Sequence, residues 1–169
     1  MTDIEKTPKV MLRKMTADEY LRFKGCNISD YAEDLIRGKG LNREQALAAA
    51  GKEYEEMLPF GLETEGQFLM SILDAENKEE VGSIWFFYDD KHGLKQVFLG
   101  DFLIYETERR KGYGAAALAE MERMAKTDGC TESVLYVWDH NPAGYSLYQK
   151  CGYVTITHED GGSVMKKSL

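Results

Sequence analysis

The stretch Arg109-Arg110-Lys111-Gly112-Tyr113-Gly114 decides the fold of this 169-residue chain, because it joins a predicted strand to a strongly helical segment. Two glycines allow the backbone to come close to an anion. The free amides and the dipole of the helix that follows favour negative charge at the same place, and three basic side chains add to it. The basic tripeptide alone fits a solvated turn better than an anion site. Its position between strand and helix predicts a phosphate or pyrophosphate site.

A second motif begins 27 residues beyond Gly114 and runs from Asn141 to Tyr153 as Asn-x-x-Gly-x-x-Leu-Tyr-x-Lys-x-Gly-Tyr. Asparagine followed by Pro142 is typical of a helix start. Gly144 and Tyr148 are four residues apart and therefore share one helical face. A glycine one turn before the tyrosine leaves space beside the phenol for a ligand. A core aromatic with its hydroxyl at the rim is the alternative interpretation of Tyr148.

The periodicity around these motifs predicts a mixed domain in the order β-α-α-β-β-β-α-β-α-β-β. The expected strands are Lys9–Arg13, Gln67–Asp74, Val81–Tyr88, Gln96–Tyr105, Ser133–Trp138, Tyr153–Thr157 and Ser163–Lys167. The expected helices run from Thr16 to about Arg37, from Asn42 to about Pro59, from Ala115 to Lys126 and from Asn141 to Gly152. The fold class is therefore α/β (α+β), with helices flanking a largely antiparallel central sheet. We expect residues 1–169 to form a single domain.

Composition limits the function classes. The chain carries 29 acidic and 21 basic residues, a formal net charge of −8, which argues against a nucleic-acid partner and slightly favours a cationic substrate. No apolar run is long enough for a membrane span, so no membrane partner is expected. The segment from Met1 to Lys6 is charged and lacks the apolar core of a signal peptide, which predicts a cytoplasmic location.

Cysteine and histidine do not form a recognisable pattern. The cysteines number three, without CxxC spacing, so neither a disulfide framework nor a structural zinc site is expected. The three histidines, His92, His140 and His158, are too scattered to suggest a metal site. We predict no metal, and a structural role for His140 at a helix entry.

In this order and separation the two motifs resemble those of the GNAT superfamily of acetyl-CoA-dependent N-acetyltransferases, as in its small bacterial members. Arg109-x-x-Gly112-x-Gly114 matches the family's pyrophosphate loop, Arg/Gln-x-x-Gly-x-Gly/Ala. The second motif is similar to the family's Asn-x-x-Ala-x-x-Leu-Tyr-x-Lys-x-Gly-Phe. Gly144 stands where alanine is usual, and Tyr153 where phenylalanine is usual. Together the motifs cover roughly residues 97–153.

The resemblance implies that acetyl-CoA is the co-substrate, bound in a wedge where the strand before the loop separates from the strand after the helix. The loop amides would hold the pyrophosphate, and main-chain groups would pair with the pantetheine arm as an added strand does. An N–H near Leu103 would face the thioester carbonyl and stabilise the oxyanion. The residues assigned to the cofactor are Phe102, Leu103, Ile104, Arg109, Arg110, Lys111, Gly112, Tyr113, Gly114, Ala115, Asn141 and Gly144.

The resemblance also implies an N-acetyltransferase in which a primary amine attacks acetyl-CoA directly in a ternary complex. Tyr148 is the candidate acid for the departing thiolate, since a phenol has a pKa of about 10. Asp101 is the candidate base, acting directly or through water; a surface aspartate is the alternative. Cys151 lies near the C-terminal end of its helix, where the dipole disfavours a thiolate, so an acetyl-cysteine intermediate is not expected.

The acceptor and the assembly state stay open. The first two helices and the loop from Pro59 to Glu65 should form the acceptor groove, which fits lysine side chains, protein N-termini, polyamines or aminoglycosides. A homodimer is possible through the edge strands between Tyr153 and Lys167. The alternative function is an inactive acyl-CoA-binding sensor or interaction domain, which the presence of Tyr148 disfavours. The glutamates of the groove fit an acidic mouth or a solvated face; they are Glu53, Glu55, Glu56, Glu63 and Glu65.

Overall fold

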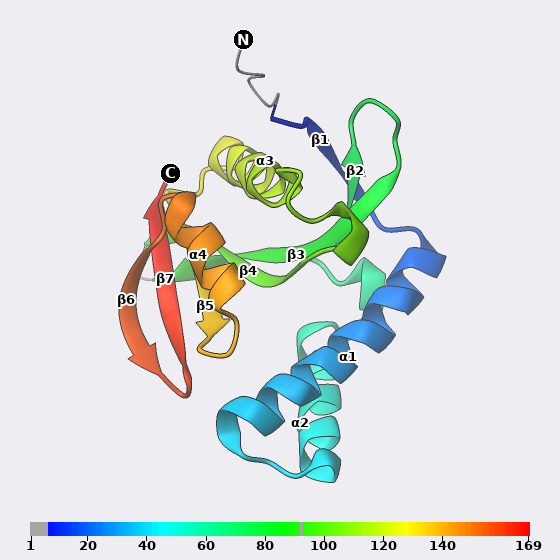
Figure 1. The fold of residues 1–169 in the computed structure, drawn as a ribbon, viewed down its shortest axis with the longest axis vertical. Coiled ribbons are helices and arrows are strands. Elements are labelled where there is room, and N and C mark those ends of the chain that lie inside the picture. Colours follow the sequence, from blue (N-terminus) through cyan, green and yellow to red (C-terminus); the bar gives the residue numbers. More distant parts are fainter. Residues whose placement is uncertain (1–6, 92) are drawn as a thin grey trace.

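A computed structural model describes residues 7–91 and 93–169, and within these residues it contains a seven-stranded sheet and four α-helices (Figure 1). The segment from Met1 to Lys6 and the side chain of His92 lie outside the described residues. The strands are β1 (Val10–Lys14), β2 (Gln67–Asp74), β3 (Glu80–Lys91), β4 (Leu94–Ile104), β5 (Glu132–Trp138), β6 (Val154–Glu159) and β7 (Gly162–Ser168). The helices are α1 (Ala17–Lys39), α2 (Arg43–Met57), α3 (Tyr113–Thr127) and α4 (Pro142–Lys150), with short 3-10 turns η1 (Gly61–Glu63) and η2 (Glu106–Glu108).

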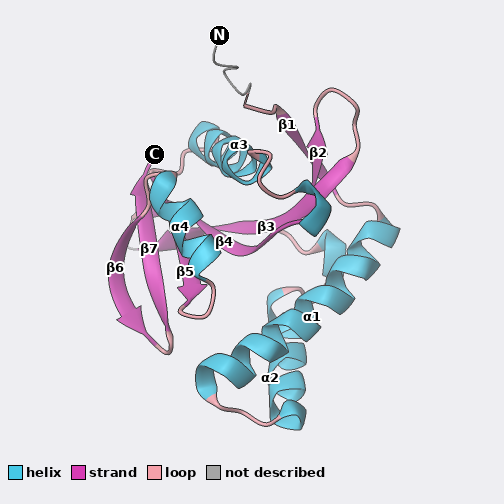
Figure 2. Cartoon of the chain, in the orientation of Figure 1, coloured by secondary structure: helices cyan, strands magenta, loops and turns pink. Residues whose placement is uncertain are grey.

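The sheet has the strand order β1-β2-β3-β4-β5-β7-β6, and helices flank it, as Figure 2 shows. Only β4 and β5 pair in parallel among the described strands; the other neighbours are antiparallel. The predicted mixed α/β fold with a largely antiparallel sheet is therefore confirmed, together with the predicted order of its elements.

Alternate side chains of the sheet enter two different cores. On β3, Ile84 and Phe86 belong to the larger core, which also receives Leu118 and Met121 of α3. Trp85 points to the other face and packs with side chains of α1 and α2. This alternation follows from the two-residue period of a strand and places α3 and α4 opposite α1 and α2.

The main difference from the predicted elements is at the turn after β3. The polar run from Asp89 to Gly93 reads as a turn, yet the strand continues to Lys91. Asp90 stands opposite Lys95 in the β3–β4 register, so opposite charges extend the ladder. Gly25 could bend a helix, but it lies inside a continuous α1 at a position where an added Cβ would contact nothing.

The strands β4 and β5 separate near the centre of the sheet. Their pairing is limited to residues 96–99 of β4 and 132–135 of β5, although both strands continue beyond it. A bulge at Gly100 interrupts the β3–β4 ladder at the same level, since Trp85 pairs with Asp101 and Phe86 with Leu99. Bulges bend and twist a strand. The result is a V-shaped opening between the last residues of the two strands.

Within the part of the chain that the structure describes, no helix has the length and hydrophobicity needed to cross a membrane.

Candidate active site

The loop between β4 and α3 presents a row of backbone donors. Arg110 and Gly112 both adopt left-handed φ angles, 62° and 88°, which turn the chain sharply before Tyr113. No side chain caps the N-terminus of α3. Among the described residues, none of the amides from Arg110 to Ala115 has a hydrogen-bond acceptor. These donors at a helix N-terminus form the arrangement that proteins use to bind phosphate groups.

The basic side chains of this loop are less mobile than the sequence suggests. Arg109 donates from Nε to the carbonyl oxygen of Ile104, at 2.9 Å, and so ties the loop to the end of β4. Lys111 pairs with Glu108 at 2.9 Å. Arg110 has no partner among residues 7–91 and 93–169. One of the three predicted positive charges is therefore available without breaking a contact.

Three of the four glycines in the motifs, Gly112, Gly114 and Gly144, have separate structural reasons. Gly112 needs its positive φ, and an added Cβ would lie 2.9 Å from Pro8. A Cβ on Gly114 would meet Leu147 at 3.1 Å, so this glycine lets α3 approach α4. The space beside Gly144, expected next to the Tyr148 phenol, is filled by the side chain of Asn141, whose Oδ1 accepts from the Gly144 amide at 3.0 Å.

The last residues of β4 keep one edge toward the opening. The amide of Tyr105 donates to β3, while the carbonyl of Ile104 faces away from β3 and accepts from Arg109. Because successive groups of a strand alternate in direction, the amide of Leu103 faces β3, and those of Phe102 and Ile104 face the side from which β5 has separated. A donor near Leu103 that serves the opening would therefore come from one of its two neighbours, and the amide of Phe102 also hydrogen-bonds the Asp101 carboxylate.

A cavity of about 540 Å³ lies at this opening and brings together Asp101, Phe102, Asn141 and Tyr148. A smaller cavity of about 220 Å³ adjoins it, because Asn27, Asp30 and Asp101 line both. Leu103 lines the smaller cavity, whereas Ile104, Gly144 and residues 109–115 line neither. The structure thus places the two candidate catalytic residues together. The glycine-containing loop follows the C-terminal end of β4 and lies outside both cavities.

Tyr148 is buried, with 8% of its surface exposed, and its ring packs edge-on against Tyr153 at 6.0 Å. Its hydroxyl makes no hydrogen bond within the described residues, where no fully buried polar side-chain atom lacks a partner, so the hydroxyl keeps some exposure. The residue lines the larger cavity. Burial, followed by the nearby charge of Asp101 and by Cys151, raises the pKa of the Tyr148 phenol. The phenol is therefore protonated at neutral pH and free to donate to a bound group.

Asp101 follows the β4 bulge and faces α1. Burial raises the pKa of its carboxyl to about 6, with a further contribution from the charge of Asp30. Hydrogen bonds from Asn27 and from the backbone of Phe102 act in the opposite direction, and Asp34 raises it again. A carboxylate of this kind is a stronger base than an ordinary aspartate and is still largely ionised near neutral pH.

The acidic groups of the cavity differ from those expected. Of the five glutamates in the predicted groove, only Glu53 lines it. Glu55, Glu56 and Glu63 pair with surface lysines, and Glu65 lies outside both cavities. Sequence reasoning missed four carboxylates of the cavity, Asp30, Asp34, Glu159 and Asp160, because they come from separate segments. The available signal was the i, i+4 spacing of Asp30 and Asp34, which places both on one face of α1.

The remaining titratable candidates are in structural positions. His140 Nε2 lies 2.6 Å from Asp34 Oδ1, and its ring stacks on Trp138, so it joins the entry of α4 to α1. The cysteines of the described chain are free thiols, and Cys151 is half-buried. No group of three or more His, Cys, Asp or Glu side chains among the described residues could hold a metal ion.

Comparisons with known proteins agree with this geometry. Residues 31–153 match the acetyltransferase (GNAT) family. The uncharacterized N-acetyltransferase YdgE of Bacillus subtilis is 30% identical over 142 residues, which are 84% of this chain and 90% of YdgE. The uncharacterized N-acetyltransferase YycN of the same organism is 30% identical over 160 residues, 95% of this chain and 99% of YycN.

Solved structures show the same fold. The crystal structure of YycN superposes with a TM-score of 0.79 at 28% identity, covering 89% of this chain and 98% of that one. PaiA N-acetyltransferase from Thermoplasma acidophilum, in complex with coenzyme A, has a TM-score of 0.67 at 18% identity and covers 95% and 99% of the two chains. With its opened β4–β5 pair and its phosphate-type loop, this chain belongs to the GNAT family of acetyltransferases.

Proposed function

We propose that the protein transfers the acetyl group of acetyl-CoA to a primary amine by direct attack in a ternary complex. The observation that carries this proposal is the convergence of Asp101 and Tyr148 on one cavity at the point where β4 and β5 separate. An acid, a base and an unpaired strand edge at one place are what amide formation from a thioester requires.

The cofactor would lie along the loop and the free edge of β4. The amides from Arg110 to Ala115 would receive the pyrophosphate, with the unpartnered Arg110 as added charge. Main-chain groups of Phe102 and Ile104 would pair with the pantetheine arm as an added strand does. Coenzyme A bound to structural neighbours, PaiA and a Vibrio cholerae spermidine N-acetyltransferase, supports a cofactor of this class.

The acceptor must lose a proton before it attacks, because an alkylammonium group has a pKa of about 10.4. Asp101 is the proposed base, and its raised pKa, about 6, improves proton uptake while leaving the carboxylate ionised. The amine nitrogen then bonds to the thioester carbon, and the oxyanion that forms is stabilised by an amide of the β4 edge. Asn27 and Asp30 would position and tune the base rather than react.

The carbon–sulfur bond breaks in the last step and leaves a thiolate on coenzyme A. Tyr148 is the proposed donor, because its hydroxyl is protonated, lacks a partner in the described chain and lines the cavity. General-acid help of this kind contributes roughly 10²–10⁴-fold.

Direct attack is favoured over a covalent acetyl-cysteine. Burial and the charge of Glu122 raise the pKa of the Cys151 thiol, which keeps it protonated and weakly nucleophilic. Neither Cys26 nor Cys151 lines the larger cavity, and Cys130 lies outside both.

The test is release of free thiol from acetyl-CoA with a panel of primary amines, with the acetylated products identified by mass. We expect thiol release to depend on the amine and to match the amide formed, one for one. Binding of coenzyme A without amine-dependent release would instead support the sensor alternative.

A further inference from the structure

The larger cavity contains far more negative charge than one reacting amine requires. Six carboxylates line it, against a single basic side chain, Lys39. Asp101 and Asp30 form an inner pair beside Tyr148, and the charge of Asp30 raises the pKa of Asp101. The other four carboxylates, here called the outer group, come from α1, α2 and the β6–β7 turn, which is taken to include Glu159 at the end of β6 and Asp160.

The outer carboxylates form one group with two tyrosines. Tyr31 of α1 donates to Glu53 Oε2 at 2.7 Å. The pKa of Tyr31 is raised by burial, by Glu53, and by the nearby Asp34 and Tyr136. Tyr136 of β5 in turn donates to the carbonyl oxygens of Glu159 and Asp160, at 3.1 and 2.9 Å. These contacts bring α1, α2, β5 and the β6–β7 turn to one end of the cavity.

Most of this outer charge is not neutralised by the chain itself. Asp34 contacts His140, and Glu53 accepts only from a neutral phenol. The carboxylates of Glu159 and Asp160 have no side-chain partner within residues 7–91 and 93–169. A cation entering this end would therefore find acceptors without displacing an internal ion pair.

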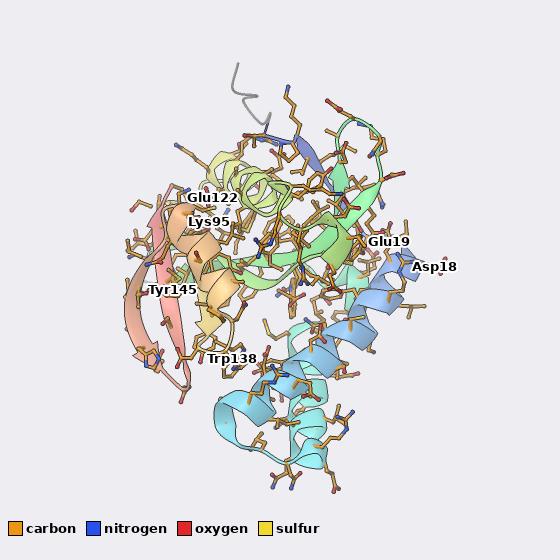
Figure 3. The ribbon with its side chains drawn as sticks, in the orientation of Figure 1. Asp18, Glu19, Lys95, Glu122, Trp138 and Tyr145 are labelled. Atoms are coloured by element: carbon orange, nitrogen blue, oxygen red, sulfur yellow. The ribbon has the colours of Figure 1, made fainter. Side chains whose placement is uncertain are left out.

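Four aromatic rings form an aromatic wall of the same cavity. Trp138 and Tyr136 pack edge-on at 5.1 Å, and Phe87 stacks on Phe98 at 5.2 Å. All four line the cavity, and Figure 3 shows Trp138 at the end of β5, on the side that faces α1. Aromatic rings of this kind pack against an aliphatic chain, and their faces attract ammonium groups.

We propose that the outer end of the cavity is a second cation subsite, so that the acceptor is a linear aliphatic amine with at least two protonated amino groups. This inference rests on the proposed acetyl transfer. One amino group would lie at Asp101 and Tyr148, the aliphatic chain along the aromatic wall, and the second amino group among Glu53, Asp34 and the carboxylates of the β6–β7 turn.

The chemistry of the subsite distinguishes this acceptor from other amines. An amine without a second charge would leave the outer carboxylates without a partner, and an amino acid would bring its carboxylate toward them. Like charges at close range repel, so acidic acceptors should bind poorly. The unpartnered, buried Tyr148 at the inner end fixes the direction in which the chain enters.

The test compares 1,5-diaminopentane with pentylamine, which has the same chain and one charge. For each we measure kcat/KM by thiol release and affinity by calorimetry in the presence of coenzyme A. We expect the diamine to be favoured at least about tenfold in both measurements. Glu53→Gln keeps an oxygen for Tyr31 but removes the charge, and should reduce the preference at least threefold by lowering only the diamine's values.

Glu55→Gln is the matched control, since Glu55 is also on α2 but pairs with Lys24 outside the cavity. It should leave the preference unchanged. Equal values for the two amines, or equal losses for both in Glu53→Gln, would overturn the second subsite even if acetyl transfer occurs. Tight, Glu53-dependent diamine binding without any thiol release would support the subsite and contradict the proposed transfer.

Discussion

The two halves of the site are built from different parts of the chain. The proposed cofactor half would use backbone groups of one continuous stretch, from Phe102 to Ala115. The proposed acceptor half would use side chains from α1, α2, β3, β4, β5, the end of β6 and the turn after it. Backbone recognition requires a particular local conformation, which leaves a short pattern in the sequence. Recognition by side chains requires only that the fold brings suitable groups together.

The two halves meet at Asp101 and Tyr148. These residues belong to β4 and α4, elements that also shape the V-shaped opening. Changes at the meeting point should therefore affect turnover, changes in the loop should affect cofactor affinity, and a change at Glu53 of α2 should affect only the acceptor half. The predictions below test this division.

The largest effect is expected for Tyr148→Phe, which removes the hydroxyl and keeps the buried ring. We expect kcat to fall at least tenfold, since the thiolate loses its donor. The dissociation constant of acetyl-CoA, measured by calorimetry, should change little. Tyr145→Phe is the control, because its hydroxyl contacts Thr155 and it lines neither cavity. Unchanged turnover in Tyr148→Phe would remove this residue from the mechanism.

Asp101→Asn should lower kcat/KM near neutral pH by about tenfold to a hundredfold, because the base is lost. In the wild type, activity should rise with pH through a pKa of about 6, as the carboxyl group ionises. The variant should lack this rise. A pH profile of kcat/KM for both proteins checks the prediction, and an identical rise in the variant would point to another base.

Gly112→Ala should weaken coenzyme A binding by about tenfold. Alanine disfavours the φ of 88°, and its Cβ would lie 2.9 Å from Pro8, so the row of amides would shift. Gly129→Ala is the matched control: its φ is 95°, but its Cβ would contact nothing. Both variants should lose some thermal stability, and only the first should lose affinity. Equal affinity in both would contradict the role of the loop amides.

The smallest effect is expected for Glu19→Gln. Glu19 joins α1 to the sheet through Arg13, at 2.6 Å, and Ser71, at 2.9 Å. The hydrogen bond from Arg13 lowers the pKa of Glu19 to about 2, against 4.5 for an ordinary glutamate. Its stabilising contribution is therefore complete above pH 4.5 and is lost as the pH falls toward 2.

Thermal unfolding at several pH values checks this effect. Glu19→Gln should cost about 1–2 kcal/mol at neutral pH and less at pH 3. At pH 3 the unfolded wild type, with the ordinary pKa of 4.5, has taken up a proton that the folded carboxylate has not, so part of the stabilisation is already lost. Glu63→Gln should change little, since Glu63 makes an exposed pair with Lys14. A loss that is the same at both pH values would assign the effect to packing instead.

The sequence allowed the fold, and the position of the glycine-containing loop between β4 and α3, to be predicted for physical reasons. The capping box at Thr16 and Glu19 and the asparagine cap at Asn141 depend on neighbouring residues, so their patterns are local. The pattern of the loop between β4 and α3 likewise depends only on neighbouring residues. Its glycines were interpreted less well, because the close contacts of Gly114 with Leu147 and of Gly144 with Asn141 depend on helix packing and capping.

The acceptor half could not be predicted to the same extent. Asp34 and Glu159 are far apart in the sequence, and nothing in either segment indicates that they share a cavity. The glutamates of α2 and the loop after it were expected to form the mouth, but most of them face lysines on the surface. Periodicity identifies the faces of a helix without stating which partner each face meets.

A crystal structure of the protein with coenzyme A and 1,5-diaminopentane tests the account most directly. We expect the diphosphate at the amides of residues 110–115 and the thiol sulfur beside the hydroxyl of Tyr148, with one amino group at Asp101 and the other near Glu53. Coenzyme A bound away from the opening between β4 and β5, or a sulfur atom remote from Tyr148, would contradict it.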